Sequence, residues 1–198
     1  MEAKKKLSTR MMAINAILIA VMIVMMVTPL GRLPLPLVSV TIAHIPILVT
    51  VIVFGLYSGL IVAFAFGITS LLLALAAPSS LLDPFFVNPL ISVLPRMLIP
   101  VTTFLTYRGL SALLKKWPKS DAVSAAVSIV VGNLTNTFGV YTMLYLIYAK
   151  SIFETTGESA MSLIITAVST STFIKCVVVV IITTPLVLVL KRVEKGKV

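Results

Sequence analysis

The sequence predicts an all-α membrane protein, a compact bundle of six transmembrane helices with both termini in the cytoplasm. The first observation is composition: 59% of the 198 residues are hydrophobic and 11% are charged, and the mean hydropathy is +1.15, values outside the range of soluble domains. The second is length, because a helix needs roughly 20 apolar residues to cross about 30 Å of hydrocarbon, and the chain offers several such runs. The third is pattern, since the runs lack the alternation of polar and apolar residues of an outer-membrane barrel.

A single domain, residues 1–198, is expected to contain all the helices, at about 9–28, 40–56, 58–77, 88–114, 120–148 and 158–192. The first follows KKK as a secretory signal would, but it is long and no small-residue cleavage site follows, so we expect it to remain as a span. The second and third meet at the glycine turn FGLYSG. A basic segment separates the fourth from the fifth, and the polar segment AKSIFETTGE precedes the sixth. The closing run VVVVIITTPLVLVL is too long for a soluble strand.

Basic residues gather before the first helix, between the fourth and fifth helices, and after the sixth. They are Lys4, Lys5, Lys6, Arg10, Arg108, Lys115, Lys116, Lys119, Lys191, Arg192, Lys195 and Lys197. Only Arg32 and Lys150 fall in the opposite connections. Because cytoplasmic loops accumulate Lys and Arg, both termini are predicted to be cytoplasmic. The net charge of +10 is then explained by orientation and anionic headgroups rather than by nucleic-acid binding.

The connections on the predicted outer side are rich in proline. PLGRLPLPLVSV, after the first helix, contains three prolines that favour extended backbone and remove helical hydrogen bonds. APSSLLDPFFVNP, before the fourth helix, is similar in character. Stiff apolar loops on one face suit a lid over a substrate cavity. Packing at the membrane interface is the alternative interpretation.

Three potential cations, His44, Arg96 and Lys175, lie within apolar runs that contain no acidic residue. From the outer helix ends, Arg96 is expected about 12 Å deep and Lys175 about 22 Å deep, with His44 near the mouth. A charge in hydrocarbon is costly and usually functional, so a buried cluster of one sign indicates that its partner comes from outside. The sequence therefore predicts a binding site for a small anion.

Other polar side chains are predicted to line the same cavity. Asn88 lies eight residues before Arg96, on nearly the same helical face. Asn133, Asn136 and Tyr141 belong to the fifth helix. The bilayer supplies no hydrogen-bond partners, so all of these groups must find them in the protein or a ligand.

Each of these residues also has a structural interpretation. Arg96 reaches the outer headgroups or loop carbonyls if its side chain snorkels. Lys175 is deeper, and its alternative is a contact between helices. His44, beside Pro46, is placed to cap a helix turn. Asparagines within membrane helices often join one helix to another.

The sequence lacks the residues that several classes of protein function require. The acidic residues fall in loops or tails, so we expect none to be buried and no carboxylate relay for proton coupling. No GxxxxGK[ST] loop is present, and the sole histidine has no evident nucleophile to activate. Cys176 is the only cysteine, so no thiolate metal site or disulfide arises within the chain. We expect a non-catalytic binding protein without cofactor or metal, which depends on partners for energy.

A docking face for such a partner is predicted on the first helix. Ala13, Ala16 and Ala20 recur at near-helical spacing, and small residues let another membrane helix approach closely.

The segments HIPILVTVIVFGLYSGLIVAFAFGITSLLLALAAPSS and FFVNPLISVLPRMLIP resemble the S components, the substrate-binding subunits, of energy-coupling factor (ECF) vitamin transporters. The NPLISVLPR motif most resembles the branch of pantothenate-type S components. The resemblance implies a bacterial plasma-membrane protein that captures a vitamin outside the cell. It also implies docking, through positions such as Ala16 and Ala20, on a transmembrane coupling subunit that works with two ATP-binding cassette ATPases.

Two further expectations follow from this resemblance. The connection containing Leu33, Pro34, Leu35 and Pro36 is expected to gate the site. The whole subunit is expected to topple in the membrane during transport, which is costly for buried cations unless a ligand or protein groups compensate them.

Pantothenate is the vitamin that best suits these residues. Its carboxylate matches Arg96 or Lys175, and its hydroxyls and amide match the asparagines. Riboflavin, its phosphate, folate or a hydroxymethylpyrimidine stay open, with Phe85, Phe86 and Tyr141 as stacking residues for a flavin. A stand-alone carrier and a membrane enzyme acting on an anionic substrate are the alternatives of another class.

Overall fold

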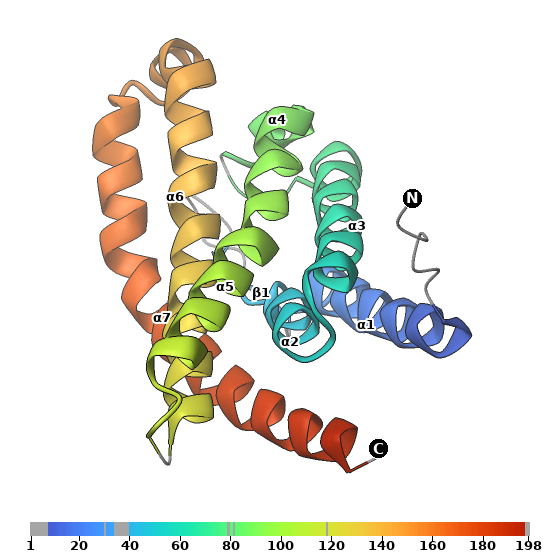
Figure 1. Cartoon of the computed structure of the whole chain (residues 1–198). Helices are drawn as coiled ribbons and strands as arrows, with labels where there is room; N and C mark the ends of the chain where they lie inside the picture. The colour runs from blue at the N-terminus through green and yellow to red at the C-terminus, as the bar shows by residue number, and fades with distance from the viewer. Residues whose placement is uncertain are drawn as a thin grey trace, which may run out of the picture.

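A computed structural model describes residues 8–29, 31–33, 40–78, 80, 82–117 and 119–196, and Figure 1 shows the chain. These residues form α-helices, one short 3-10 helix and one pair of two-residue strands, so the all-α prediction is confirmed. In chain order the elements are α1 (Thr9–Val27), β1 (Arg32–Leu33), β2 (Val40–Thr41), α2 (Ile45–Phe54), α3 (Leu56–Ala76), η1 (Asp83–Val87), α4 (Pro89–Ser92), α5 (Leu94–Leu113), α6 (Ser120–Thr156) and α7 (Ala160–Lys195).

Within the part of the chain that the structure describes, five stretches of helix are long and apolar enough to cross a membrane. They are Thr9–Val27, Leu56–Ala76, Pro89–Leu113, Ser120–Thr156 and Thr172–Glu194. The remaining apolar helix, α2, has ten residues. The chain is thus a multi-pass membrane protein, while six spans and the side of the termini stay predictions.

Helix α2 starts later than its predicted range of 40–56. Val40–Thr41 pairs antiparallel with Arg32–Leu33 instead of extending the helix. The helix begins next to Pro46, whose fixed φ and missing N–H suit a first helical turn. Eight of its ten residues, Ile45 through Ile52, are buried. A helix that is apolar on all sides belongs in the centre of a bundle, and α2 packs there against α1, α3, α5 and α7.

The predicted helix 88–114 is interrupted at Val93, which separates α4 from α5. The cause is Pro95, because proline lacks the N–H that would bond the carbonyl of Ile91 and its ring crowds that carbonyl. Asn88 begins α4, its side-chain oxygen accepting a hydrogen bond from the Leu90 N–H at 3.0 Å. The interruption leaves the Ile91 carbonyl available to another donor.

The polar segment predicted to connect the last two helices is mostly helical. Helix α6 runs on to Thr156 past a kink at Tyr148 (φ −124°, ψ 15°), and Gly157 ends it in the left-handed conformation (φ 72°). Helices α6 and α7 lie side by side, and the turn that joins them rises beyond α4 (Figure 1). The sequence prediction was wrong here because Ile152, which is buried, extends the apolar face of α6 through a polar segment.

One acidic residue contradicts the expectation that none is buried. Asp83 is 4% exposed at the start of η1. Its carboxylate accepts a hydrogen bond from the Ser80 N–H at 3.0 Å. The proline-rich connection folds onto the bundle and covers this side chain, which the composition of a loop does not reveal.

Candidate functional site

Arg96 lies near the start of α5 and is 4% exposed. Its Nη1 donates a 2.5 Å hydrogen bond to the Ile91 carbonyl freed by Pro95, and its Nη2 donates to Ser70 Oγ on α3 at 3.3 Å. The guanidinium also lies over two aromatic rings, at 5.7 Å from the centroid of Phe66 and 5.2 Å from that of Phe86. Its Nε has no hydrogen bond. The side chain therefore points into the bundle and does not snorkel.

Lys175 reaches from α7 toward α6. Its Nζ donates a hydrogen bond to Thr137 Oγ1 at 2.9 Å. It lies within electrostatic range of Arg96, which has the same sign of charge. No salt bridge to either cation occurs among the described residues. The two cations thus share one region of the bundle without a carboxylate partner in that part of the chain.

His44, which precedes α2, is fully buried in the same region. Lys175 and Arg96 are both within its electrostatic range, and the side chain of Asn133 and the backbone of Thr41 are its polar neighbours. Neither ring nitrogen forms a hydrogen bond of ordinary geometry. His44 is the N-cap residue of α2, and its carbonyl accepts a hydrogen bond from the Ile47 N–H at 3.0 Å, but its ring forms no capping hydrogen bond.

Asn133 and Asn136 belong to the buried face of α6, at 0% and 4% exposure. Both polar atoms of the Asn133 side chain and the Oδ1 of Asn136 have no hydrogen bond. We use the name polar cluster for His44, Arg96, Asn133, Asn136 and Lys175. Buried polar atoms are nearly always hydrogen-bonded in folded proteins. The unpaired atoms of the polar cluster therefore have the capacity to bind a polar ligand or ordered water.

Asn88 and Tyr141, the other predicted ligand-binding residues, have different surroundings. Asn88 caps α4 and donates a long hydrogen bond, 3.4 Å, to the Tyr148 hydroxyl at the kink of α6. Tyr141 packs in the second core cluster of the protein, with residues such as Phe86 and Leu144.

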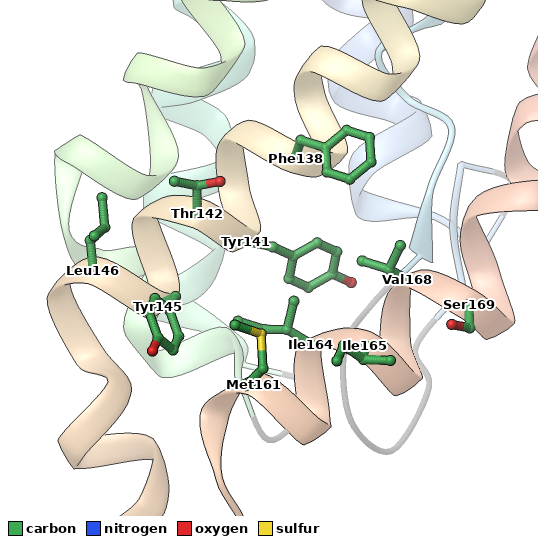
Figure 2. A pocket seen from close by; sticks show the side chains of 10 residues that line it. All are labelled: Phe138, Tyr141, Thr142, Tyr145, Leu146, Met161, Ile164, Ile165, Val168 and Ser169. Carbon is green, nitrogen blue, oxygen red and sulfur yellow. The ribbon is translucent and has the colours of Figure 1, made fainter.

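Tyr141 instead lines a cavity of about 320 Å³ between α6 and α7 (Figure 2). Its ring extends from α6 toward α7, with the hydroxyl pointing toward Val168 (Figure 2). The lining residues are Phe138, Tyr141, Thr142, Tyr145, Leu146, Met161, Ile164, Ile165, Val168 and Ser169. The cavity is mostly apolar, and most of its side chains are exposed to the surroundings of the bundle.

Sequence reasoning missed the residues that hold the cations. Phe66 and Ser70 of α3 contact Arg96, and Thr137 binds Lys175. Thr137 had a detectable signal, because it lies four residues after Asn133 in an apolar helix and so shares its face. No sequence pattern identified Phe66 and Ser70, because their contact with Arg96 depends on how α3 packs against α5.

The predicted gate and docking residues are only partly described. Pro34, Leu35 and Pro36 lie outside the described residues, and of Leu33 only its place in β1 is described. Ala13, Ala16 and Ala20 are all exposed on α1, which packs against α2 and α3.

Cations and buried amides with open hydrogen-bonding capacity, surrounded by apolar helices, define the class: a multi-pass membrane protein with a polar cluster inside its helix bundle. The sequence matches the family described as "ECF transporter, substrate-specific component" over residues 10–187. The chain belongs to this family. It is a non-catalytic, substrate-binding transporter subunit that associates with coupling and ATPase subunits, which confirms the prediction that it is not an enzyme. No curated protein matches the sequence significantly.

Proposed function

We propose that this S component captures a small anionic vitamin in the polar cluster, and that the vitamin is pantothenate. The observation that carries the proposal is the pair of cations, buried Arg96 and half-buried Lys175, with no carboxylate partner among the described residues. Burying an ionised side chain without a counter-charge costs several kcal/mol, so an incoming carboxylate offsets a penalty that the free protein carries.

The hydrogen-bonding groups of the polar cluster fit the rest of pantothenate. Asn133 and Asn136 offer free amide atoms to its hydroxyls and amide, and His44 offers two ring nitrogens. The apolar side chains of α2, such as Leu48 and Val49, suit its geminal methyl groups. A flavin would need stacking rings, but Trp117 is 62% exposed beyond α5, and Phe66 and Phe86 already lie against the Arg96 guanidinium.

The orientation and docking face complete the proposal. Both termini lie in the cytoplasm of a bacterial cell, because the basic residues of the α5–α6 connection and of the chain ends belong on that side. The exposed stripe Ala13, Ala16 and Ala20 of α1 docks on the coupling subunit, whose two ATPases supply the energy for release. Protease accessibility of tags at either end, in intact and opened cells, tests the orientation.

The deciding experiment measures thermal stabilisation of the purified chain by pantothenate, riboflavin, riboflavin phosphate, folate and a hydroxymethylpyrimidine. Pantothenol, in which an alcohol replaces the carboxylate, is the matched ligand control. Pantothenate at a hundredfold excess over its dissociation constant adds about 2.7 kcal/mol of stability, and pantothenol adds far less. Arg96→Ala and Lys175→Ala each remove most of the pantothenate effect. Equal stabilisation by pantothenol, or stabilisation only by an uncharged vitamin, refutes the anion-binding proposal.

A further inference from the structure

Four of the five side chains of the polar cluster are buried in this structure and Lys175 is half-buried, so a ligand needs a route to them. His44, Arg96, Asn133 and Asn136 are each at most 4% exposed. A route must therefore open next to at least one of these groups or next to Lys175. A cavity lies between α6 and α7, the two helices that carry Thr137 and Lys175.

This connection follows from position along the helices. Tyr141, on the inner wall of the cavity at 8% exposure, is four residues from Thr137, about 6 Å along the same face of α6. Val168, on the opposite wall, is seven residues from Lys175, about 10 Å along nearly the same face of α7. Thr137 and Lys175 bond each other across the two helices. The cavity thus lies one to two turns above this hydrogen bond, on the side of the Gly157 turn.

We infer that the α6–α7 cavity is an entry portal through which the anionic ligand reaches Lys175, with Tyr141 as the side chain that must move aside. The inference rests on the proposed function, because it takes the polar cluster as the binding site. The mouth consists of exposed side chains such as Phe138, Tyr145 and Met161, so the cavity is open to the outside of the bundle. The Tyr141 ring extends from α6 toward α7 on the wall of the cavity, and its hydroxyl points toward Val168 (Figure 2).

The surrounding structure allows the gap to widen. The α6–α7 hairpin is joined by three residues, Gly157 to Ser159, and α6 is already kinked at Tyr148. Hinges of this kind are a few residues at the ends of elements that absorb a backbone change. The Lys175 ammonium, one to two helical turns from the cavity, supplies the attraction for an anion.

The test uses an anionic thiol reagent as the probe, so that it does not depend on pantothenate. Thr137→Cys is introduced with Cys176→Ala, and the protein in nanodiscs is treated with 2-sulfonatoethyl methanethiosulfonate. The thiolate introduced by Thr137→Cys attacks the reagent sulfur, a mixed disulfide forms, and methanesulfinate leaves. Val168→Trp fills the cavity, and Val189→Trp, at a position of α7 that is 56% exposed and far from it, is the matched control.

The portal predicts that the introduced thiol is labelled, that Val168→Trp slows labelling at least tenfold, and that Val189→Trp does not. Labelling that is absent, unaffected by Val168→Trp, or slowed equally by both variants overturns the portal. If Val168→Trp has no effect on labelling, the cavity is not a route to the polar cluster, and its apolar lining is then a binding site for a lipid acyl chain instead.

Binding of pantothenate to the same tryptophan variants, made in the natural background, separates the portal from a ligand subsite. A portal residue changes the association and dissociation rate constants together, so Val168→Trp lowers both by a similar factor and leaves the dissociation constant within twofold. A large loss of affinity with an unchanged dissociation rate contradicts a portal. If pantothenate does not bind the unmodified protein, the proposed function fails while the labelling experiment still decides the portal.

Discussion

Replacing Lys175 by methionine separates a ligand-binding cation from a structural one, because the two roles predict opposite signs. Methionine keeps the length of the side chain and removes its charge. The lost hydrogen bond to Thr137 costs about 1.5 to 3 kcal/mol, since its donor is charged. The gain is removal of a half-buried ammonium group whose charge has the same sign as that of Arg96, which offsets a cost of similar size. We expect the free energy of unfolding of the free protein to be unchanged or higher.

Ligand binding should change in the opposite direction. Loss of one partner of a buried charge pair costs at least about 2 kcal/mol of binding, which weakens the dissociation constant about thirtyfold. Pantothenate at a hundredfold excess for the unmodified protein is then only at about a threefold excess for Lys175→Met. Its stabilisation falls from about 2.7 to about 0.9 kcal/mol.

The assay is thermal unfolding of the purified chain with and without pantothenate. Lys150→Met is the matched control, because the Lys150 side chain is 92% exposed and its pairing with Glu154 at 3.9 Å is worth about 0.5 kcal/mol or less. That control should leave ligand stabilisation intact. A free Lys175→Met protein that is destabilised by about 2 kcal/mol, yet is stabilised by pantothenate as strongly as the unmodified chain, refutes the reasoning and makes Lys175 a structural residue.

Three further substitutions and one control substitution test the packing of the helices and their ends, each measured by thermal unfolding. Gly132→Ala should destabilise by about 1 to 3 kcal/mol, because its Cβ would lie 2.1 Å from Thr103 Oγ1. Gly109→Ala, with no neighbour within 4 Å, is its control and should be neutral or stabilising by about 0.5 to 1 kcal/mol; equal effects of the two contradict the packing argument. Gly157→Ala should cost about 1 kcal/mol because its φ is 72°, and no loss means that this turn relaxes. Asn88→Ala should cost about 1 kcal/mol through the lost cap of α4, and an unchanged melting temperature would show that the cap contributes nothing.

The class of the fold and the chemical character of the site are both readable from the amino-acid sequence. Membrane helices must satisfy their own backbone, so apolar runs of sufficient length predict helices with little competition from other structures. The cost of a charge in hydrocarbon marks residues such as Arg96 and Lys175 without any structure. The small residues of α1 and the basic segments also stand out in the sequence, since both depend on spacing and charge along the chain.

Which of those residues meet depends on tertiary packing. Pro95 breaks the helix between α4 and α5, and the freed Ile91 carbonyl then turns Arg96 inward between Phe66 and Phe86. Asn88 fits the same sequence pattern as Arg96, yet it lies just before α4 in extended backbone and caps that helix, because its side-chain oxygen accepts the Leu90 N–H. A helical-face argument assumes an unbroken helix, and a break removes its basis.

The same limit explains the two segments that the sequence misassigned. Asp83 lies in a connection with loop composition but becomes buried when η1 folds onto the bundle. The polar segment after Tyr148 continues as helix because Ile152 finds an apolar surface on its neighbours. Hydrophobic patterns are local properties of the chain, whereas burial depends on which other elements arrive at the same place. Local patterns therefore predict cations within a membrane bundle, and packing alone brings His44, Arg96 and Lys175 into one region and leaves a cavity between α6 and α7.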